Sequence, residues 1–311
     1  MYPVETRNNF LVLTPDGVGS TYLQRALTVY LQCADLDYWN THELLNGLGI
    51  EDGNLYKDWK PEYTQTVEKI CDMLLVTGNF LVSRIAHYHI KNRLERRVED
   101  YNILYKECNR KFNTILFCER DPFEYALSWS IRKNAGINNV YSIEQRIKTH
   151  GGGVKEPVDI DFFTRKLEQY GEYEYWAEDN FKIAYTVNYD EMHQNVDSVM
   201  QTITGMKHTT FLQDYSRLRY LASKDQYNGE SLEEICKMHA MVDKLQYTKR
   251  MPTTMPLKMN TMIDKQKRVT NFFDAVDVYN TWASKGNRHQ PLTEDGLVDT
   301  IAKEQSIYAD K

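Results

Sequence analysis

The chain has 311 residues and a formal net charge of −6 at pH 7, with 41% hydrophobic and 26% charged residues. This composition is typical of a globular protein, and the acidic balance argues against broad electrostatic binding to nucleic acid. The sequence has neither an apolar run of about 18 residues nor a basic start followed by an apolar stretch. We therefore expect a cytoplasmic protein without a membrane span or a secretory signal. The five cysteines lack the CxxC spacing of zinc sites, so neither a metal site nor a disulfide framework is expected.

Short β-type runs alternate with longer helical patterns along the first two thirds of the chain. Four runs predict buried strands, at residues 9–14, 79–85, 113–119 and 181–187. Two apolar stripes at helical spacing predict helices; they are Tyr22, Leu23, Ala26, Leu27, Tyr30 and Leu31, and Met192, Val196, Val199, Met200 and Ile203. This alternation predicts an α/β fold, a parallel β-sheet flanked by helices. The loops after Thr14, Ile85 and Glu119 should converge at its carboxyl edge.

The C-terminal third shows no strand pattern. From about Thr209 the period is helical, as in residues 231–247 and 269–283. We expect one domain over residues 1–311, with an α/β core over 1–208 and a helical C-terminal part over 209–311. The segment HGGGVKEP, residues 150–157, is a candidate lid or substrate loop.

The stretch TPDGVGST, residues 14–21, joins the first predicted strand to a helix. Gly17 and Gly19 allow a tight turn whose amide N–H groups can point at an anion, beside the positive end of the helix dipole. Ser20 and Thr21 can add hydroxyl hydrogen bonds. The alternative is a glycine turn in which Ser20 caps the helix. A Walker A loop is excluded, because that motif has Lys and then Ser or Thr after its last glycine, whereas here Ser20 follows Gly19 directly.

Residues 115–133, ILFCERDPFEYALSWSIRK, place Arg120 at the end of a predicted strand and Ser128 eight residues later on the following helix. A guanidinium forms fork-like hydrogen bonds to a phosphate, and a hydroxyl adds another. The alternative is an arginine paired with a protein carboxylate, beside a helix that happens to contain serine.

Residues 170–206 complete a pattern of three segments: an aromatic helix leads into a strand that ends in Tyr189 and Asp190, and the following helix closes at Gly205. In this order the three segments resemble the sulfotransferases that use 3′-phosphoadenosine 5′-phosphosulfate (PAPS), and most closely divergent bacterial or phage-type members. The resemblance implies a P-loop NTPase-like sulfotransferase fold that binds PAPS and its product adenosine 3′,5′-bisphosphate (PAP). The cofactor-binding residues it implies are Gly17, Gly19, Ser20, Thr21, Tyr22, Arg120 and Ser128.

The chain departs from this family at the glycine loop. Sulfotransferases commonly carry Lys or Arg two residues before the glycine that opens the helix, and that position is Gly17, preceded by Asp16. Arg84, at the end of the second predicted strand, is the candidate replacement cation. His87 or His89 is the candidate base, because imidazole titrates near neutral pH, and His87 lies closer to the family's position. The alternative for either histidine is that it caps or packs.

Two basic segments, DKQKR (264–268) and SKGNRH (284–289), are candidate remnants of the family's C-terminal 3′-phosphate loop, with solvated charge runs as the alternative. The resemblance implies metal-free transfer of a sulfuryl group from PAPS to a hydroxyl or amine of a small-molecule or glycan acceptor. An oligomer is compatible with this function. The second hypothesis is a catalytically silent sulfotransferase-like module that binds or has a structural role in a larger assembly, such as that of a phage.

Overall fold

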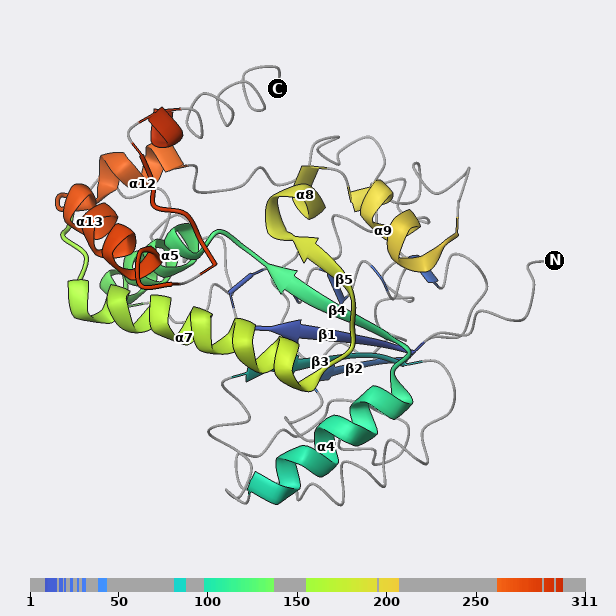
Figure 1. The fold of residues 1–311 in the computed structure, drawn as a ribbon. Helices are drawn as coiled ribbons and strands as arrows, with labels where there is room; N and C mark the ends of the chain where they lie inside the picture. Colours follow the sequence, from blue (N-terminus) through green and yellow to red (C-terminus); the bar gives the residue numbers. More distant parts are fainter. Residues whose placement is uncertain are drawn as a thin grey trace, which may run out of the picture. The chain divides into compact units, whose positions relative to one another are not determined.

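A computed structural model of the chain describes residues 9–15, 17–18, 20, 23–24, 27, 30–31, 39–43, 81–87, 98–136, 155–194, 196–206, 262–286, 288–293 and 295–298 (Figure 1). The chain divides into two compact units. The first comprises Met1–Glu119 and Tyr175–Thr253, and the second comprises Arg120–Glu174 and Thr254–Lys311.

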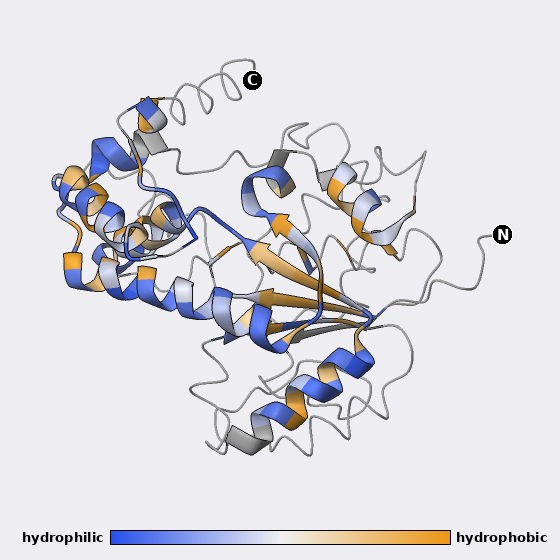
Figure 2. Cartoon of the chain, viewed as in Figure 1, coloured by the Kyte–Doolittle hydropathy of each residue, from blue (hydrophilic) through white to orange (hydrophobic). Residues whose placement is uncertain are grey.

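The first unit is built on a five-stranded parallel sheet in the order β2-β3-β1-β4-β5 (Figure 1). Its strands are β1 (Phe10–Thr14), β2 (Trp39–Glu43), β3 (Leu81–Ala86), β4 (Thr114–Glu119) and β5 (Ile183–Asn188). In the central strand β1, Val12 lies opposite Arg84 of β3, and Leu13 lies opposite Phe117 of β4. β1 is buried along its whole length and β4 along nearly all of it, as continuous apolar runs predict; both appear hydrophobic in Figure 2.

All four strands expected from the sequence are confirmed, with ends that agree to within two residues. Because β3, β1 and β4 are parallel neighbours, their carboxyl ends lie along one edge of the sheet, as expected. The strand β2, with the sequence WNTHE, was not expected. β2 lies at one end of the five-stranded sheet, and a strand in that position does not need an apolar run. Its sequence is polar and therefore did not predict a strand.

Seven helices have bounds in the described part of the chain: α4 (Val98–Lys111), α5 (Pro122–Asn134), α7 (Ile160–Asn180), α8 (Tyr189–Gln194), α9 (Val196–Thr204), α12 (Met262–Arg268) and α13 (Phe272–Ala283). None of these helices is both long and apolar enough to cross a membrane. The described side chains of both predicted stripes are buried; they are Leu23, Leu27, Tyr30, Leu31, Met192, Val199, Met200 and Ile203. The second stripe is split between α8 and α9, and α9 ends before Gly205, whose φ of 67° favours glycine.

The second unit has an apolar core that joins α5 to α7 and α13. The ring of Phe123 on α5 lies 5.7 Å from that of Phe163 and 5.6 Å from those of Phe272 and Tyr279, all edge-on. This shared core groups the segment after β4 with the C-terminal helices in one unit. The helix expected over residues 269–283 is found as α13, whereas residues 231–247 and 150–154 lie outside the described residues.

Cys118 on β4 provides a test of this arrangement. Burial raises the pKa of its thiol to about 12, against a smaller lowering by the charge of Arg84. The thiolate is the reactive form, so at about pH 8 we expect Cys118 to resist iodoacetamide in the folded protein and to react after unfolding in guanidinium. Timed labelling followed by peptide mass spectrometry measures the difference. Rapid labelling of Cys118 in the native protein would contradict its position in a buried strand.

Candidate functional site

The glycine loop turns as the sequence predicts. Gly17 lies three residues after the end of β1 and has a φ of 72°, a left-handed conformation that favours glycine. Ser20 is already helical and buried, and Gln24, one turn later, donates to the carbonyl of Val82 on β3 at 3.3 Å. The segment after the loop is therefore anchored to the sheet. The roles expected for the other loop residues stay predictions, because they lie outside the described residues: Gly19, Thr21 and Tyr22.

Arg84 reaches the glycine loop from the neighbouring strand. Its Nη1 donates to Oγ of Ser20 at 3.3 Å, and the two residues are 3% and 4% exposed. Arg84 lies two residues before the end of β3, so it is inside the strand and not at its end as expected. Its backbone is in register with Val12 of β1. The sheet thus brings a guanidinium to the glycine loop.

His87, the candidate base, directly follows β3 and is half-buried. Its ring packs against that of Trp176 on α7, with centroids 5.1 Å apart. Trp176 in turn donates from Nε1 to the hydroxyl of Tyr105 at 2.9 Å. Such a ring contact agrees with the alternative that His87 packs against other side chains. A catalytic role for His87 stays a prediction. His89, the other candidate, lies outside the described residues.

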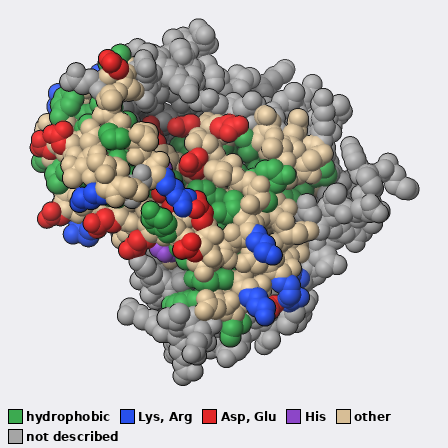
Figure 3. All heavy atoms as spheres, in the orientation of Figure 1, with side chains coloured by type: hydrophobic (Ala, Val, Ile, Leu, Met, Phe, Trp, Pro, Cys, Tyr) green, Lys and Arg blue, Asp and Glu red, His purple; other side chains and the backbone are tan. Residues whose placement is uncertain are grey.

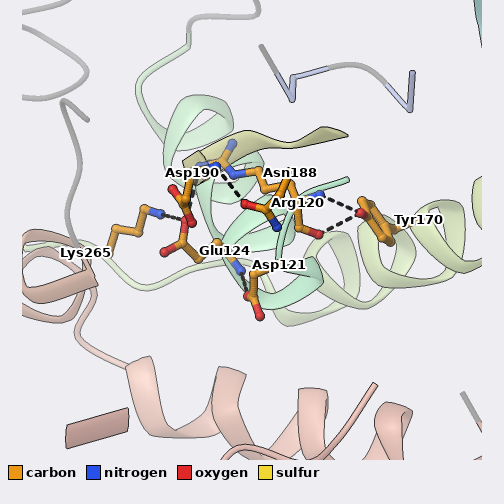
Figure 4. Close-up of polar contacts among 8 residues, drawn as sticks. Arg120, Asp121, Glu124, Tyr170, Asn188, Asp190 and Lys265 are labelled. Carbon is orange, nitrogen blue, oxygen red and sulfur yellow. Dashed lines mark hydrogen bonds and ion pairs between the residues drawn. The ribbon is translucent and has the colours of Figure 1, made fainter. Parts of the chain in front are cut away.

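The second unit contains the other predicted pair. Arg120 directly follows β4, and its Nη2 donates to Oγ of Ser128 on α5 at 3.1 Å. The side chain of Asp121 caps α5 by accepting from the backbone N–H of Glu124 at 2.8 Å, and Pro122 begins the helix (Figure 4). The sequence RDPFE therefore fixes the start of the helix. The spacing of four residues then brings Glu124 and Ser128 to the same side as Arg120.

Tyr170 on α7 holds the backbone of Arg120. Its hydroxyl accepts from the Arg120 N–H at 2.9 Å and donates to the Arg120 carbonyl at 2.6 Å (Figure 4). The sequence did not predict this contact, because no local pattern indicates that a tyrosine in an aromatic helix binds the backbone of a residue 50 positions away. One buried side chain thus satisfies both main-chain groups of the residue that carries the guanidinium.

Glu124 is buried between two cations. Its Oε2 lies 3.5 Å from Nη2 of Arg120 and 3.3 Å from Nζ of Lys265 on α12 (Figure 4). Lys265 is 0% exposed, so this lysine of the DKQKR segment is not part of a solvated charge run. Burial and the charge of Glu124 raise the pKa of the neighbouring Asp121, whereas its capping hydrogen bond lowers it.

His289, from the SKGNRH segment, also lies in the second unit. Its Nε2 is 2.8 Å from Oε1 of Glu174, and its ring stacks on that of Trp282 with centroids 5.7 Å apart. Each basic segment therefore contributes one side chain to the packed part of this unit. Their origin as a 3′-phosphate loop stays a prediction.

Each predicted pair combines a guanidinium with a hydroxyl, a set of donors suited to an oxyanion. Ser20 and Arg84 form the pair of the first unit, and Arg120 and Ser128 form that of the second. On the face drawn in Figure 3, basic side chains of the described residues stand among acidic ones at the left, and a few basic side chains gather at the lower right. Within the same residues, no group of three or more His, Cys, Asp or Glu side chains is placed to hold a metal ion.

Replacing Tyr170 with Phe tests how much the two hydrogen bonds between its hydroxyl and the Arg120 backbone stabilise the fold. The change leaves two buried backbone groups without their hydroxyl partner, so we expect Tyr170→Phe to lower the free energy of unfolding by about 1–3 kcal/mol. Urea denaturation followed by circular dichroism measures the loss. Tyr185→Phe is the matched control, because Tyr185 on β5 is exposed, and it should change stability by less than about 0.5 kcal/mol. Equal stability of the two variants would contradict the role assigned to Tyr170.

Comparison with known proteins adds no family assignment. No protein-family model matches the chain, and no curated protein matches it. The case for a function therefore rests on the residues and contacts described above.

Proposed function

We propose that the protein is a PAPS-dependent sulfotransferase that transfers a sulfuryl group to a hydroxyl or amine of a small-molecule or glycan acceptor. The observation that carries the proposal is the 3.3 Å contact between Arg84 and Ser20 at the glycine loop. The loop lacks the basic residue of the family, and the sequence points to Arg84 as its replacement. The contact supports this substitution, because it puts the guanidinium within reach of an anion that the loop would hold.

In the proposed reaction, the phosphosulfate is held by Ser20, the loop amides and Arg84. The acceptor oxygen or nitrogen attacks sulfur in line, a new bond to sulfur forms, and the bond between sulfur and the bridging oxygen breaks. The electron pair of that bond stays on the oxygen, which becomes a phosphate oxygen of PAP. Arg84 stabilises this developing charge, since a fixed donor in a buried setting acts more strongly than one in water. The proton of the acceptor passes to His87.

The second pair is proposed to bind the 3′-phosphate of the nucleotide. Arg120 donates to the oxygen of Ser128, which leaves the serine's own O–H able to donate to a phosphate oxygen. The guanidinium, which also lies 3.5 Å from Oε2 of Glu124, is the cationic group of this pair and has several N–H groups. The Tyr170 contacts support this role, because they fix the backbone from which the guanidinium extends.

A catalytically silent module is the second candidate. The packing of His87 against Trp176 favours it, since the ring already has a structural contact. The absence of a basic residue at Gly17 favours it too. Such a protein would keep both arginine–hydroxyl pairs and bind PAP, but would not turn PAPS over.

Binding of PAP tests the donor site. We expect wild-type protein to bind PAP in isothermal titration calorimetry and to melt at a higher temperature with PAP present. Arg84→Met should weaken binding about tenfold or more, because charge-assisted hydrogen bonds to the 5′-phosphate of PAP are lost. Arg110→Met on α4 is the matched control, since that side chain is 54% exposed, and it should bind as wild type. Absence of PAP binding by the wild type would contradict both candidate functions.

Turnover separates the two candidates. With ³⁵S-labelled PAPS and a panel of sugars, phenols and amines, a transferase should label at least one acceptor class. His87→Gln should then lower kcat by about 10²–10⁴-fold with little change in the affinity for PAP, as loss of a general base does. Binding of PAP without any labelled acceptor would favour the silent module. An unchanged kcat in His87→Gln would instead remove His87 from the mechanism.

A further inference from the structure

An aromatic cluster surrounds Trp176 in the first unit. Trp176 lies near the C-terminal end of α7, and its ring packs edge-on against those of Tyr105 and Phe181, with centroids 6.1 Å and 5.0 Å away. Tyr105 and Phe181 also pack on each other at 5.2 Å. The hydroxyl of Tyr105 accepts from Nε1 of Trp176 at 2.9 Å. Two rings and one hydrogen bond therefore fix the position of the indole.

Hydrogen bonds also fix the backbone of this cluster. Nδ2 of Asn180 donates to the carbonyl of Trp176 at 2.8 Å. Nδ2 of Asn109 on α4 donates to the carbonyls of Tyr105 at 2.9 Å and Asn180 at 2.7 Å, and its Oδ1 accepts from the N–H of Lys182 at 2.8 Å. These bonds join α4 to the end of α7, so a ring that packs on the indole meets an ordered surface.

The ring of His87 packs on this fixed indole. The centroids are 5.1 Å apart and the planes are inclined by 37°, which is nearer to stacked than to edge-on. A cation within about 6 Å of an indole is attracted to its π-face, and indole is the strongest aromatic partner. The imidazole becomes a cation when it takes up a proton. The indole can therefore stabilise the protonated form of His87, which packing alone does not require.

We propose that Trp176 is a positioning residue that fixes the imidazole of His87 and stabilises its protonated form, so that His87 can take the proton of the acceptor. The inference rests on the proposed function, in which His87 is the base. The bond between the acceptor atom and its hydrogen breaks, its electron pair stays on the acceptor atom that attacks sulfur, and the proton binds a ring nitrogen of His87. Trp176 acts through His87 and does not itself touch the acceptor.

Other titratable groups stay constant when position 176 is changed. The elements of this cluster carry several of them along the chain: Arg84 on β3, Tyr101 and Tyr105 on α4, and Glu172, Glu178 and Asp179 on α7. Burial raises the pKa of Tyr105 to about 12, so its hydroxyl stays neutral where an imidazole titrates. His87 has further contacts, and these are common to all variants at position 176. Differences among those variants therefore report on the indole.

NMR titration of the His87 imidazole tests the stabilisation in the free protein, with its signal assigned from His87→Gln. In Trp176→Leu the midpoint should move to lower pH by about half a pH unit, because the protonated ring loses its partner. Trp176→Phe keeps a weaker aromatic face, so it should move the midpoint the same way but less. If the indole only buried the imidazole, its removal would expose the ring to water and raise the midpoint. A midpoint that rises or stays unchanged in Trp176→Leu would overturn the inference.

A milder variant guards against a loss of fold. Tyr105→Phe removes only the hydroxyl that holds the indole, so the midpoint should again move to lower pH, by less than in Trp176→Leu. If Trp176→Leu does not fold, Trp176→Phe and Tyr105→Phe decide by the same sign. Tyr175→Leu is the matched control, since Tyr175 is an exposed neighbour on the same helix, and it should titrate as wild type.

Turnover connects the contact to catalysis. With an acceptor found by PAPS labelling, Trp176→Leu should lower kcat about threefold to tenfold and move the rising limb of the pH profile of kcat/KM to lower pH. Its affinity for PAP should stay within about twofold of wild type. An unchanged kcat and profile, with a shifted NMR midpoint, would overturn the positioning role. Absence of PAP binding or of turnover in the wild type would overturn the proposed transferase, whereas the titration would still decide whether Trp176 stabilises protonated His87.

Discussion

The contact between Arg84 and Ser20 depends on the order of strands in the sheet. Because β3 pairs directly with β1, a side chain from β3 can meet the loop that follows β1. The arginine is almost fully buried, and a buried cation costs free energy unless polar groups surround it. Ser20 supplies one such group at 3.3 Å. The position of this charge is therefore a product of topology, and a different strand order would leave the glycine loop without it.

Both units use the same local chemistry. In each, an arginine at or near the end of a parallel strand donates to the hydroxyl of a serine on a helix. The surroundings differ. The backbone of Arg84 is fixed by strand pairing on both sides, whereas that of Arg120 is fixed by the hydroxyl of Tyr170. A guanidinium on a fixed backbone loses less conformational entropy when it binds an anion, so both arrangements suit oxyanion recognition.

The sequence predicted those features that have a local pattern. The apolar runs predicted four of the five strands, and residues 115–133 predicted Arg120 at the end of a strand and Ser128 on the following helix. The cap formed by Asp121 was not predicted. The polar strand β2 and the hydroxyl of Tyr170 had no such pattern. Nor did Lys265, since a run of charged residues looks the same whether or not one of them is buried. Its partner Glu124 is 141 positions away, and only the packing of α12 against α5 brings them together.

A glycine loop without a basic residue of its own can still have a positive charge beside it. A lysine on a loop has a flexible four-carbon stem and must be ordered when it binds its anion. An arginine inside a strand is already ordered by the fold, and it presents several N–H groups in a fixed plane. A cation on β3 therefore supplies the same charge as a cation on the loop, but from a different direction. The role of Gly17 is then only to form the turn, which its φ of 72° requires. As a glycine, it has no side chain to occupy the space near the loop amides.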